Sequence, residues 1–197
     1  MPYSPEREIE DIDGLINEVK GSVYLFGMSS GAMLSLMAAA NNLRIKKITL
    51  YEPPFELEKN NSSRDSTIHY NKIEELLRSD NQSGAVKYFM REIVQVPSVV
   101  TTILSLLPVW KKMKANVSSL PYDLEIARSY TLQNLKSQSI STPALPIYGG
   151  KSSEKLQNAA KAASDRIYNS KLWVLEDQSH EVSMKVLAPV LIDFLSD

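Results

Sequence analysis

The stretch Val23-Tyr24-Leu25-Phe26-Gly27-Met28-Ser29-Ser30-Gly31 decides the fold, because it joins a short apolar run to a serine set between two glycines. A continuous apolar run is typical of a strand buried on both faces, as in a parallel sheet. From about Ala32 to Ala40 the chain is rich in Ala, Met and Leu, which predicts a helix. We therefore predict a strand, a tight turn that carries Ser29, and a helix.

The turn matches the pattern Gly-x-Ser-x-Gly, and the pattern has a mechanical meaning in this context. A serine on a tight strand-to-helix turn is pushed out of the sheet and exposes its Oγ. The glycines let the backbone take a strained turn and let helix and strand approach closely. The N–H of Ser30, at the start of the helix, would lie beside an oxyanion formed at Ser29. A plain connection between strand and helix is the alternative interpretation.

Predicted strands and helices alternate along the rest of the chain. Further strands are expected at 47–51, 144–148 and 171–175, and further helices at 5–19, about 154–163 and about 186–194. This alternation predicts an α/β fold with a partial, mostly parallel sheet of about four strands. Pro146 argues against a central position for its strand, because proline has no N–H to donate to the ladder.

The middle of the chain has a different character from its two ends. It is polar, helical in pattern, and repeatedly interrupted by Asn, Ser, Gly and Pro. We therefore predict a core made of residues 1–55 and 141–197, with a helical cap inserted at 56–140. Five large side chains in the cap indicate either an apolar substrate site or simply the core of the cap: Phe89, Met90, Leu106, Trp110 and Met113.

A serine hydroxyl needs a base, and histidine is the usual one. The sequence holds two histidines, His69 and His180. His69 lies within a predicted helix of the cap. His180 follows the last predicted strand in a loop, where its ring can reach over the carboxyl edge of the sheet. We predict His180 as the base, with a solvated loop histidine as the alternative.

Taken together, these features resemble the α/β-hydrolase superfamily, and its bacterial esterase-like members in particular. The resemblance rests on the serine turn, on the cap, on Tyr51-Glu52-Pro53-Pro54-Phe55, and on the tail from His180 through Leu187-Ala188-Pro189-Val190-Leu191. It implies ester hydrolysis through an acyl-enzyme, a small-molecule ester-like substrate, and no cofactor or metal. An inert remnant of such a hydrolase, acting in binding or assembly, is the alternative function.

The resemblance leaves the acid of the catalytic triad open. The family usually places an aspartate in the turn after the strand at 144–148, and here Ser152 occupies the aspartate's place. Other members carry the acid at the end of the strand that follows the nucleophile helix, which in this chain is Glu52. Glu52 is therefore the first choice. Asp123 is the second choice, and its alternative role is to cap the start of the helix that follows it.

The family also has strands that precede the first helix, and one of them carries the loop that donates a second N–H to the oxyanion. We find no such segment before Pro5. We therefore expect the strand at 23–26 to have a bare edge that pairs with another chain. The partner would be a second copy, giving a homo-oligomer, or a missing N-terminal segment. A truncated or split gene product, a chain completed by a partner, and a non-catalytic remnant all remain open.

The composition excludes several classes of function. Lys and Arg number 22 against 23 Asp and Glu, which gives a net charge of -1 and no electrostatic basis for nucleic-acid binding. The absence of cysteine excludes disulfides and thiolate catalysis. No apolar run reaches the roughly 18 residues of a membrane span, and Met1–Arg7 does not resemble a signal peptide. We expect a cytoplasmic protein without a membrane partner, and interpret the basic cluster Lys111-Lys112-Met113-Lys114 as a solvated face.

Overall fold

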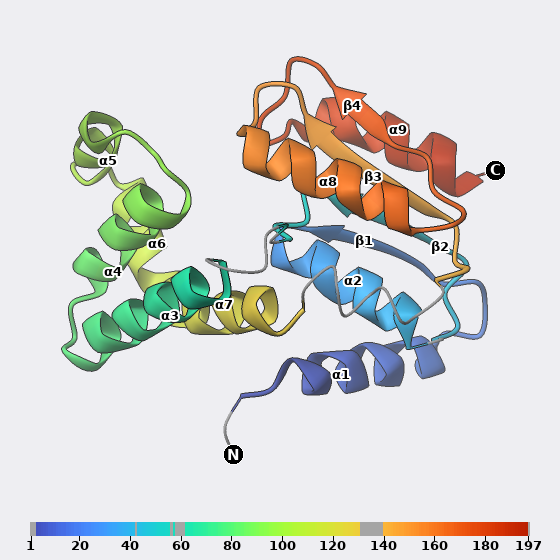
Figure 1. Cartoon of the computed structure of the whole chain (residues 1–197), viewed down its shortest axis with the longest axis horizontal. Helices are drawn as coiled ribbons and strands as arrows, with labels where there is room; N and C mark the ends of the chain where they lie inside the picture. Colours follow the sequence, from blue (N-terminus) through green and yellow to red (C-terminus); the bar gives the residue numbers. More distant parts are fainter. Residues whose placement is uncertain (1–2, 42, 56, 58–61, 131–139, 197) are drawn as a thin grey trace. The chain divides into compact units, whose positions relative to one another are not determined.

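The computed structural model describes residues 3–41, 43–55, 57, 62–130 and 140–196. The chain divides into two compact units, Met1–Glu58 with Ser129–Asp197 and Lys59–Arg128. Each unit has a hydrophobic core of its own, and Figure 1 shows the course of the chain through both.

A parallel sheet of four strands forms the centre of the first unit within the described residues. Its strands follow the order β1 (Tyr24–Met28), β2 (Lys47–Tyr51), β3 (Ala144–Gly149) and β4 (Trp173–Leu175). Because all four run parallel, their carboxyl ends lie at one edge of the sheet, where ligands of such sheets bind. The predicted α/β class and partial parallel sheet are thus confirmed.

Pro146 lies in a central strand, contrary to the expectation from its missing N–H. β3 pairs with β2 on one side and β4 on the other, and all of its residues are buried. The Ala144 N–H donates toward the β4 side, to Asn169 O, so position 146 faces the same side. On that side, the pairing between β3 and the chain leading into β4 has a gap. The gap lies between the bridge of Ala144 to Ser170 and the pair Ile147–Trp173. The proline is tolerated because it faces this gap.

Helices cover both faces of the sheet (Figure 1). On one face, Leu145 and Ile147 belong to a core cluster completed by α9 (Met184–Ser196). On the opposite face of β3, Tyr148 lies beneath the Lys161 ammonium of α8 (Glu154–Arg166). The helix that follows β1, α2 (Ser30–Ala40), packs on β1 and β2 and is itself covered by α1 (Pro5–Glu18).

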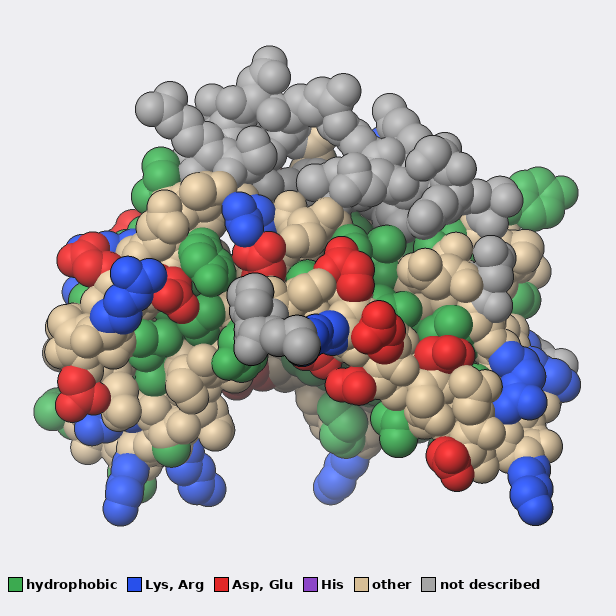
Figure 2. Space-filling view, turned by 90° about the horizontal axis from the view of Figure 1, so that it is seen from below, with side chains coloured by type: hydrophobic (Ala, Val, Ile, Leu, Met, Phe, Trp, Pro, Cys, Tyr) green, Lys and Arg blue, Asp and Glu red, His purple; other side chains and the backbone are tan. Residues whose placement is uncertain are grey.

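The positions of α1 and α2 explain their sequences. α2 has no charged residue and is buried along almost its whole length, because the sheet and α1 enclose it. α1 buries Ile9 and Ile16 toward α2. Its outer side carries acidic residues, and Figure 2 shows them gathered along this helix. An amphipathic outer helix that covers an apolar inner helix is expected where helices pack in layers on a sheet.

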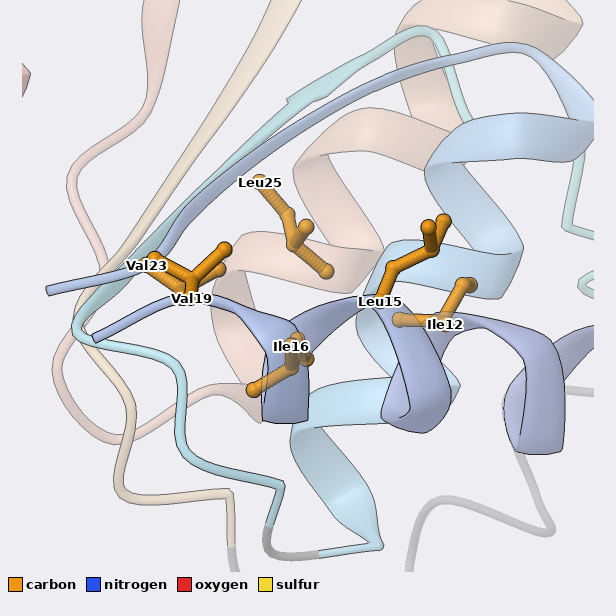
Figure 3. A pocket seen from close by; sticks show the side chains of 6 residues that line it. All are labelled: Ile12, Leu15, Ile16, Val19, Val23 and Leu25. Carbon is orange, nitrogen blue, oxygen red and sulfur yellow. The ribbon is translucent and has the colours of Figure 1, made fainter. Parts of the chain in front are cut away.

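Strand β1 is an edge strand in the part of the chain that the structure describes. It is hydrogen-bonded to β2 alone, and Tyr24 and Phe26 are 40% and 41% exposed. Beside the strand, an apolar hollow of about 150 Å³ separates it from α1 (Figure 3); its walls are formed by Ile12, Leu15, Ile16, Val19, Val23 and Leu25. Pairing of this edge with a second copy or another segment stays a prediction.

The second unit is helical throughout its described part. It contains α3 (Ser62–Arg78), α4 (Gln82–Tyr88), a π-helical turn (Phe89–Ile93), α5 (Ser98–Leu104), α6 (Val109–Asn116), a 3-10 turn (Val117–Ser119) and all but the last residue of α7 (Leu120–Ser129). Ile73, Met90 and Trp110 lie in its core. Among the helices that the structure describes, none combines the length and apolar character needed to cross a bilayer.

Candidate active site

Ser29 sits in a strained turn between β1 and α2. Its backbone has φ 55° and ψ −127°, and a positive φ is uncommon for any residue other than glycine. The Ser29 N–H donates to Tyr51 O at 2.9 Å, and the Ser29 carbonyl accepts from the Ala32 N–H at 2.9 Å. These bonds attach the turn to the end of β2 and to the first turn of α2. The surrounding structure therefore holds a conformation that the serine alone would not adopt.

The two glycines of the motif have different roles. A Cβ added at Gly27 would lie 2.2 Å from Gly31 O and 2.5 Å from the Oγ of Ser35. Only glycine at position 27 therefore lets α2 pass this close to β1. A Cβ added at Gly31 would meet no atom within 4 Å, and Gly31 has no positive φ. The expectation that both glycines serve the turn thus applies to Gly27 alone.

Glu52 follows β2 directly and is fully buried, with φ 48°. One carboxylate oxygen, Oε2, lies 2.7 Å from His180 Nδ1. The other, Oε1, accepts from the Gly149 N–H at 2.7 Å and from the Ser152 hydroxyl at 2.5 Å. A buried carboxylate is costly unless it is hydrogen-bonded, and bonds to a charged group are stronger than neutral ones. The three partners give this side chain the hydrogen bonds that burial requires.

Ser152 stands where the family usually has its catalytic aspartate, and its hydroxyl donates to the carboxylate of Glu52. The turn after β3 contributes a hydroxyl donor where the family's aspartate was expected, and the carboxylate comes from the end of β2. Gln157 holds this turn through its side-chain amide, which donates to Gly150 O at 3.1 Å and Ser152 O at 2.9 Å. Sequence reasoning missed this role of Ser152, because Ser152 and Glu52 are 100 residues apart.

His180 lies in the loop after β4 with 36% of its side chain exposed. The loop is attached to the neighbouring strands at two points. The Tyr51 hydroxyl donates to Ser179 O at 2.6 Å, and the Lys151 N–H donates to Gln178 O at 2.9 Å. Burial, and to a smaller extent the charge of Glu52, raise the pKa of Tyr51 above its ordinary value. The Tyr51 hydroxyl therefore stays protonated and remains a donor to the loop.

The remaining candidates, Asp123 and His69, belong to the second unit. Asp123 is in the first turn of α7, a helix that begins at Leu120. The alternative role as cap of a helix starting after Asp123 is therefore wrong. His69 lies on α3 in the second unit, with its Nδ1 2.9 Å from the Tyr88 hydroxyl. His180 Nδ1, by contrast, is paired with Glu52 of its own unit.

Ser29 and His180 come from the turns after β1 and β4, at the same edge of the parallel sheet. Within the described chain, no hydrogen bond joins Ser29 Oγ to the His180 ring. Such catalytic contacts are often long in unliganded enzymes and tighten with substrate bound. No group of three or more His, Asp or Glu side chains suited to a metal ion occurs among the residues that the structure describes.

Comparisons with known proteins agree with this arrangement. No protein-family model and no curated protein matches the chain. Among solved structures, an alpha/beta hydrolase from Sphaerobacter thermophilus DSM 20745 matches with a TM-score of 0.83 and 34% identity, over 99% of this chain and 76% of that one. The chain belongs to the α/β-hydrolase superfamily.

Two further structures share the fold of this α/β hydrolase. An esterase (EaEST) from Exiguobacterium antarcticum has a TM-score of 0.72 at 16% identity, over 100% of this chain and 75% of the esterase. A hydrolase from Pseudomonas aeruginosa PA01 has a TM-score of 0.69 at 18% identity, over 100% of this chain and 74% of the hydrolase. The predicted superfamily is confirmed, and its membership supports a hydrolase.

The close contact at Gly27 predicts opposite effects for two glycine substitutions. Gly27→Ala should lower the free energy of unfolding by about 1–3 kcal/mol or more, because its Cβ overlaps the α2 backbone. Gly31→Ala should raise it by roughly 0.4–1 kcal/mol, because alanine fits this backbone without strain and has fewer conformations to lose on folding. Urea unfolding followed by circular dichroism measures both. Equal losses in the two variants would contradict the assigned packing.

Proposed function

We propose that this α/β hydrolase cleaves carboxylic esters through an acyl-enzyme, with Ser29 as nucleophile, His180 as base and Glu52 as acid. The observation that carries the proposal is the 2.7 Å contact between His180 Nδ1 and the buried Oε2 of Glu52. A carboxylate only accepts, so this contact favours the tautomer with the ring proton on Nδ1 and with Nε2 as an acceptor. The same carboxylate stabilises the imidazolium that forms when Nε2 takes a proton.

The reaction has two balanced halves. Ser29 Oγ attacks the ester carbonyl carbon while His180 Nε2 takes the hydroxyl proton. The tetrahedral intermediate collapses, the bond to the alkoxy oxygen breaks, and Nε2 returns the proton to the leaving alcohol. A water then attacks the acyl-serine with the same base, which releases a carboxylic acid and restores Ser29. Glu52 keeps its charge throughout and transfers no proton.

We place the oxyanion donor at the Ser30 N–H, because Ser30 is the first residue of α2. The first N–H groups of a helix point out of its N-terminal end, where the helix dipole is positive. Ser29 is the residue just before α2 and so belongs to this same end. Donors already fixed before the reaction stabilise a developing oxyanion without reorganising.

A small-molecule ester is the proposed substrate class. Its support is the combination of a serine turn, a paired histidine and carboxylate, and the hydrolase fold. The strain at Ser29 and the buried charge of Glu52 both cost stability, and a site for catalysis gives a reason to retain them. The lack of nucleic-acid binding and the cytoplasmic location expected from the sequence stay predictions.

Ser29→Ala should reduce hydrolysis of a short-chain aryl ester on the order of 10⁴-fold or more, because nucleophile and base act as a unit. A fluorophosphonate probe should label the wild-type chain at Ser29 and leave the variant unlabelled. Circular dichroism serves as the folding control. Full activity in the pure variant would rule out Ser29 as nucleophile. A folded wild-type chain that neither reacts nor labels would favour the inert remnant instead.

Glu52→Gln should lower kcat by about 10⁴-fold with little change in KM. Its amide oxygen would take the position of Oε1 between two donors, so the NH₂ group would face His180 and favour the wrong tautomer. Asp123→Asn, in the second unit, is the control and should keep near wild-type rates. Steady-state kinetics on the same ester measures both variants. A larger loss of kcat in Asp123→Asn than in Glu52→Gln would identify Asp123 as the acid instead.

Ser152→Ala should lower kcat by about ten-fold, because a hydrogen bond to a charged group is worth roughly 1.5–3 kcal/mol and the Gly149 N–H still binds Oε1. KM should change little, since Ser152 acts on the substrate only through Glu52. Ser153→Ala is the matched control, because the Ser153 side chain is exposed and makes no capping bond. Equal kinetics for the two variants would show that Ser152 does not position the acid.

A further inference from the structure

The second unit exposes large apolar side chains on α5, on α6 and in the turn between them. Single exposed apolar residues are normal, but a contiguous group marks an interaction site. The group, named here the α5–α6 surface, has exposed fractions from 42% to 81% and consists of Val99, Val100, Ile103, Leu106, Leu107 and Val109. Leu106, expected from the sequence in a substrate site or the cap core, is 81% exposed.

Buried residues of α5 and α6 anchor the two helices that carry the α5–α6 surface. On α5 the side chain of Thr101 is fully buried, and its hydroxyl donates to Pro97 O at 3.2 Å. On α6 the indole of Trp110 is buried in the core and its Nε1 donates to the Ser83 hydroxyl at 3.1 Å. α5 thus packs Thr101 and Leu104 inward and leaves its two valines and its isoleucine exposed.

Along the segment of sequence that forms this surface, the charges are of one sign. Between Ile93 and Tyr122 the sequence has no Asp or Glu, and its three charged residues are Lys111, Lys112 and Lys114. Lys111 and Lys112 are exposed on α6, where they follow Val109 after the buried Trp110. The whole chain is nearly neutral, with a net charge of -1, so the positive character is local to this region.

We propose that the α5–α6 surface docks the protein on an anionic lipid surface. Its aliphatic side chains would enter the boundary between headgroups and acyl chains, while the lysines bind lipid phosphates. Such contact from one side needs no membrane-spanning helix. The expectation from the sequence that the protein has no membrane partner rested on the absence of a spanning segment, which does not bear on binding from one side.

Two observations favour lipid over protein as the occupant. Protein interfaces are enriched in Tyr, Trp and Arg and depleted in Lys, whereas this surface exposes aliphatic side chains beside lysines. A second copy docked about a two-fold axis would bring the same surface face to face. Its lysines would then face a segment, between Ile93 and Tyr122, that supplies no Asp or Glu. An anionic bilayer instead supplies the opposite charge.

Sedimentation of the full chain with vesicles tests the proposal. The wild-type chain should bind phosphatidylcholine vesicles that contain phosphatidylglycerol, and bind much less to phosphatidylcholine alone. Added salt should weaken the binding, because it screens exposed charges. Each lysine near an anionic surface contributes about five-fold to binding, so Lys111→Gln with Lys112→Gln should weaken it by more than ten-fold. Leu106→Ser with Leu107→Ser should weaken it similarly.

The matched control is a pair of changes on α9 in the first unit. Ile192 is 64% exposed and Lys185 is exposed, so Ile192→Ser with Lys185→Gln removes the same kinds of side chain from another surface. The control should bind vesicles like the wild-type chain. All variants should keep the wild-type thermal midpoint and hydrolyse a soluble short-chain ester at the wild-type rate.

A single label locates the contact, because the chain has no cysteine and an introduced thiol is unique. An environment-sensitive dye on Leu106→Cys should shift its emission to shorter wavelength with phosphatidylglycerol vesicles. The same dye on Ile192→Cys should not respond.

Several results would overturn the proposal. They are no binding of the wild-type chain at low salt, equal binding by the α5–α6 variants and the control, or equal responses of the two labels. Dimers in light scattering that disappear in the Leu106 and Leu107 variant, without vesicle binding, would assign the surface to a second copy. A changed KM for the soluble ester, again without vesicle binding, would assign it to the substrate.

Discussion

The buried carboxylate of Glu52 is the constraint on which the rest of the site depends. An ion removed from water costs several kcal/mol unless hydrogen bonds replace its hydration. The replacement comes from segments far from Glu52 in the sequence: Gly149 at the end of β3, Ser152 in the turn that follows it, and His180 after β4. Because a single side chain collects all three bonds, it fixes these segments relative to the end of β2. The same bonds that make burial tolerable therefore orient the histidine.

The residue before Glu52 completes this arrangement. Tyr51 accepts the Ser29 N–H through its carbonyl and donates from its hydroxyl to Ser179 O. The end of β2 thus binds the serine turn on one side and the histidine loop on the other. A parallel sheet makes this possible, since the turns after β1, β3 and β4 all lie at its carboxyl edge. The close approach at Gly27 sets where α2 begins, and with it the position of Ser30.

The chemistry and the proposed lipid contact belong to different units of the chain. The first unit holds Ser29, Glu52 and His180, all on the sheet that defines the superfamily. The second unit holds the α5–α6 surface, which takes no part in the proposed bond-breaking steps. The two proposals therefore stand independently, and a variant can lose vesicle binding while it keeps activity on a soluble ester.

The sequence by itself determined the α/β class, the serine turn and the loop position of His180, because each is encoded by a short run of neighbouring residues. The resemblance to the family ranked Glu52 ahead of Asp123 as the acid. Only the tertiary structure paired His180 with Glu52 and gave Ser152 its bond to that carboxylate, since these contacts join residues 100 or more positions apart. It also showed that Leu106, which the sequence had assigned to a substrate site or to the core of the cap, is exposed. The spacing of apolar residues along the chain predicts which face of a helix is apolar. Whether that face is buried, and against what, depends on how distant segments come together.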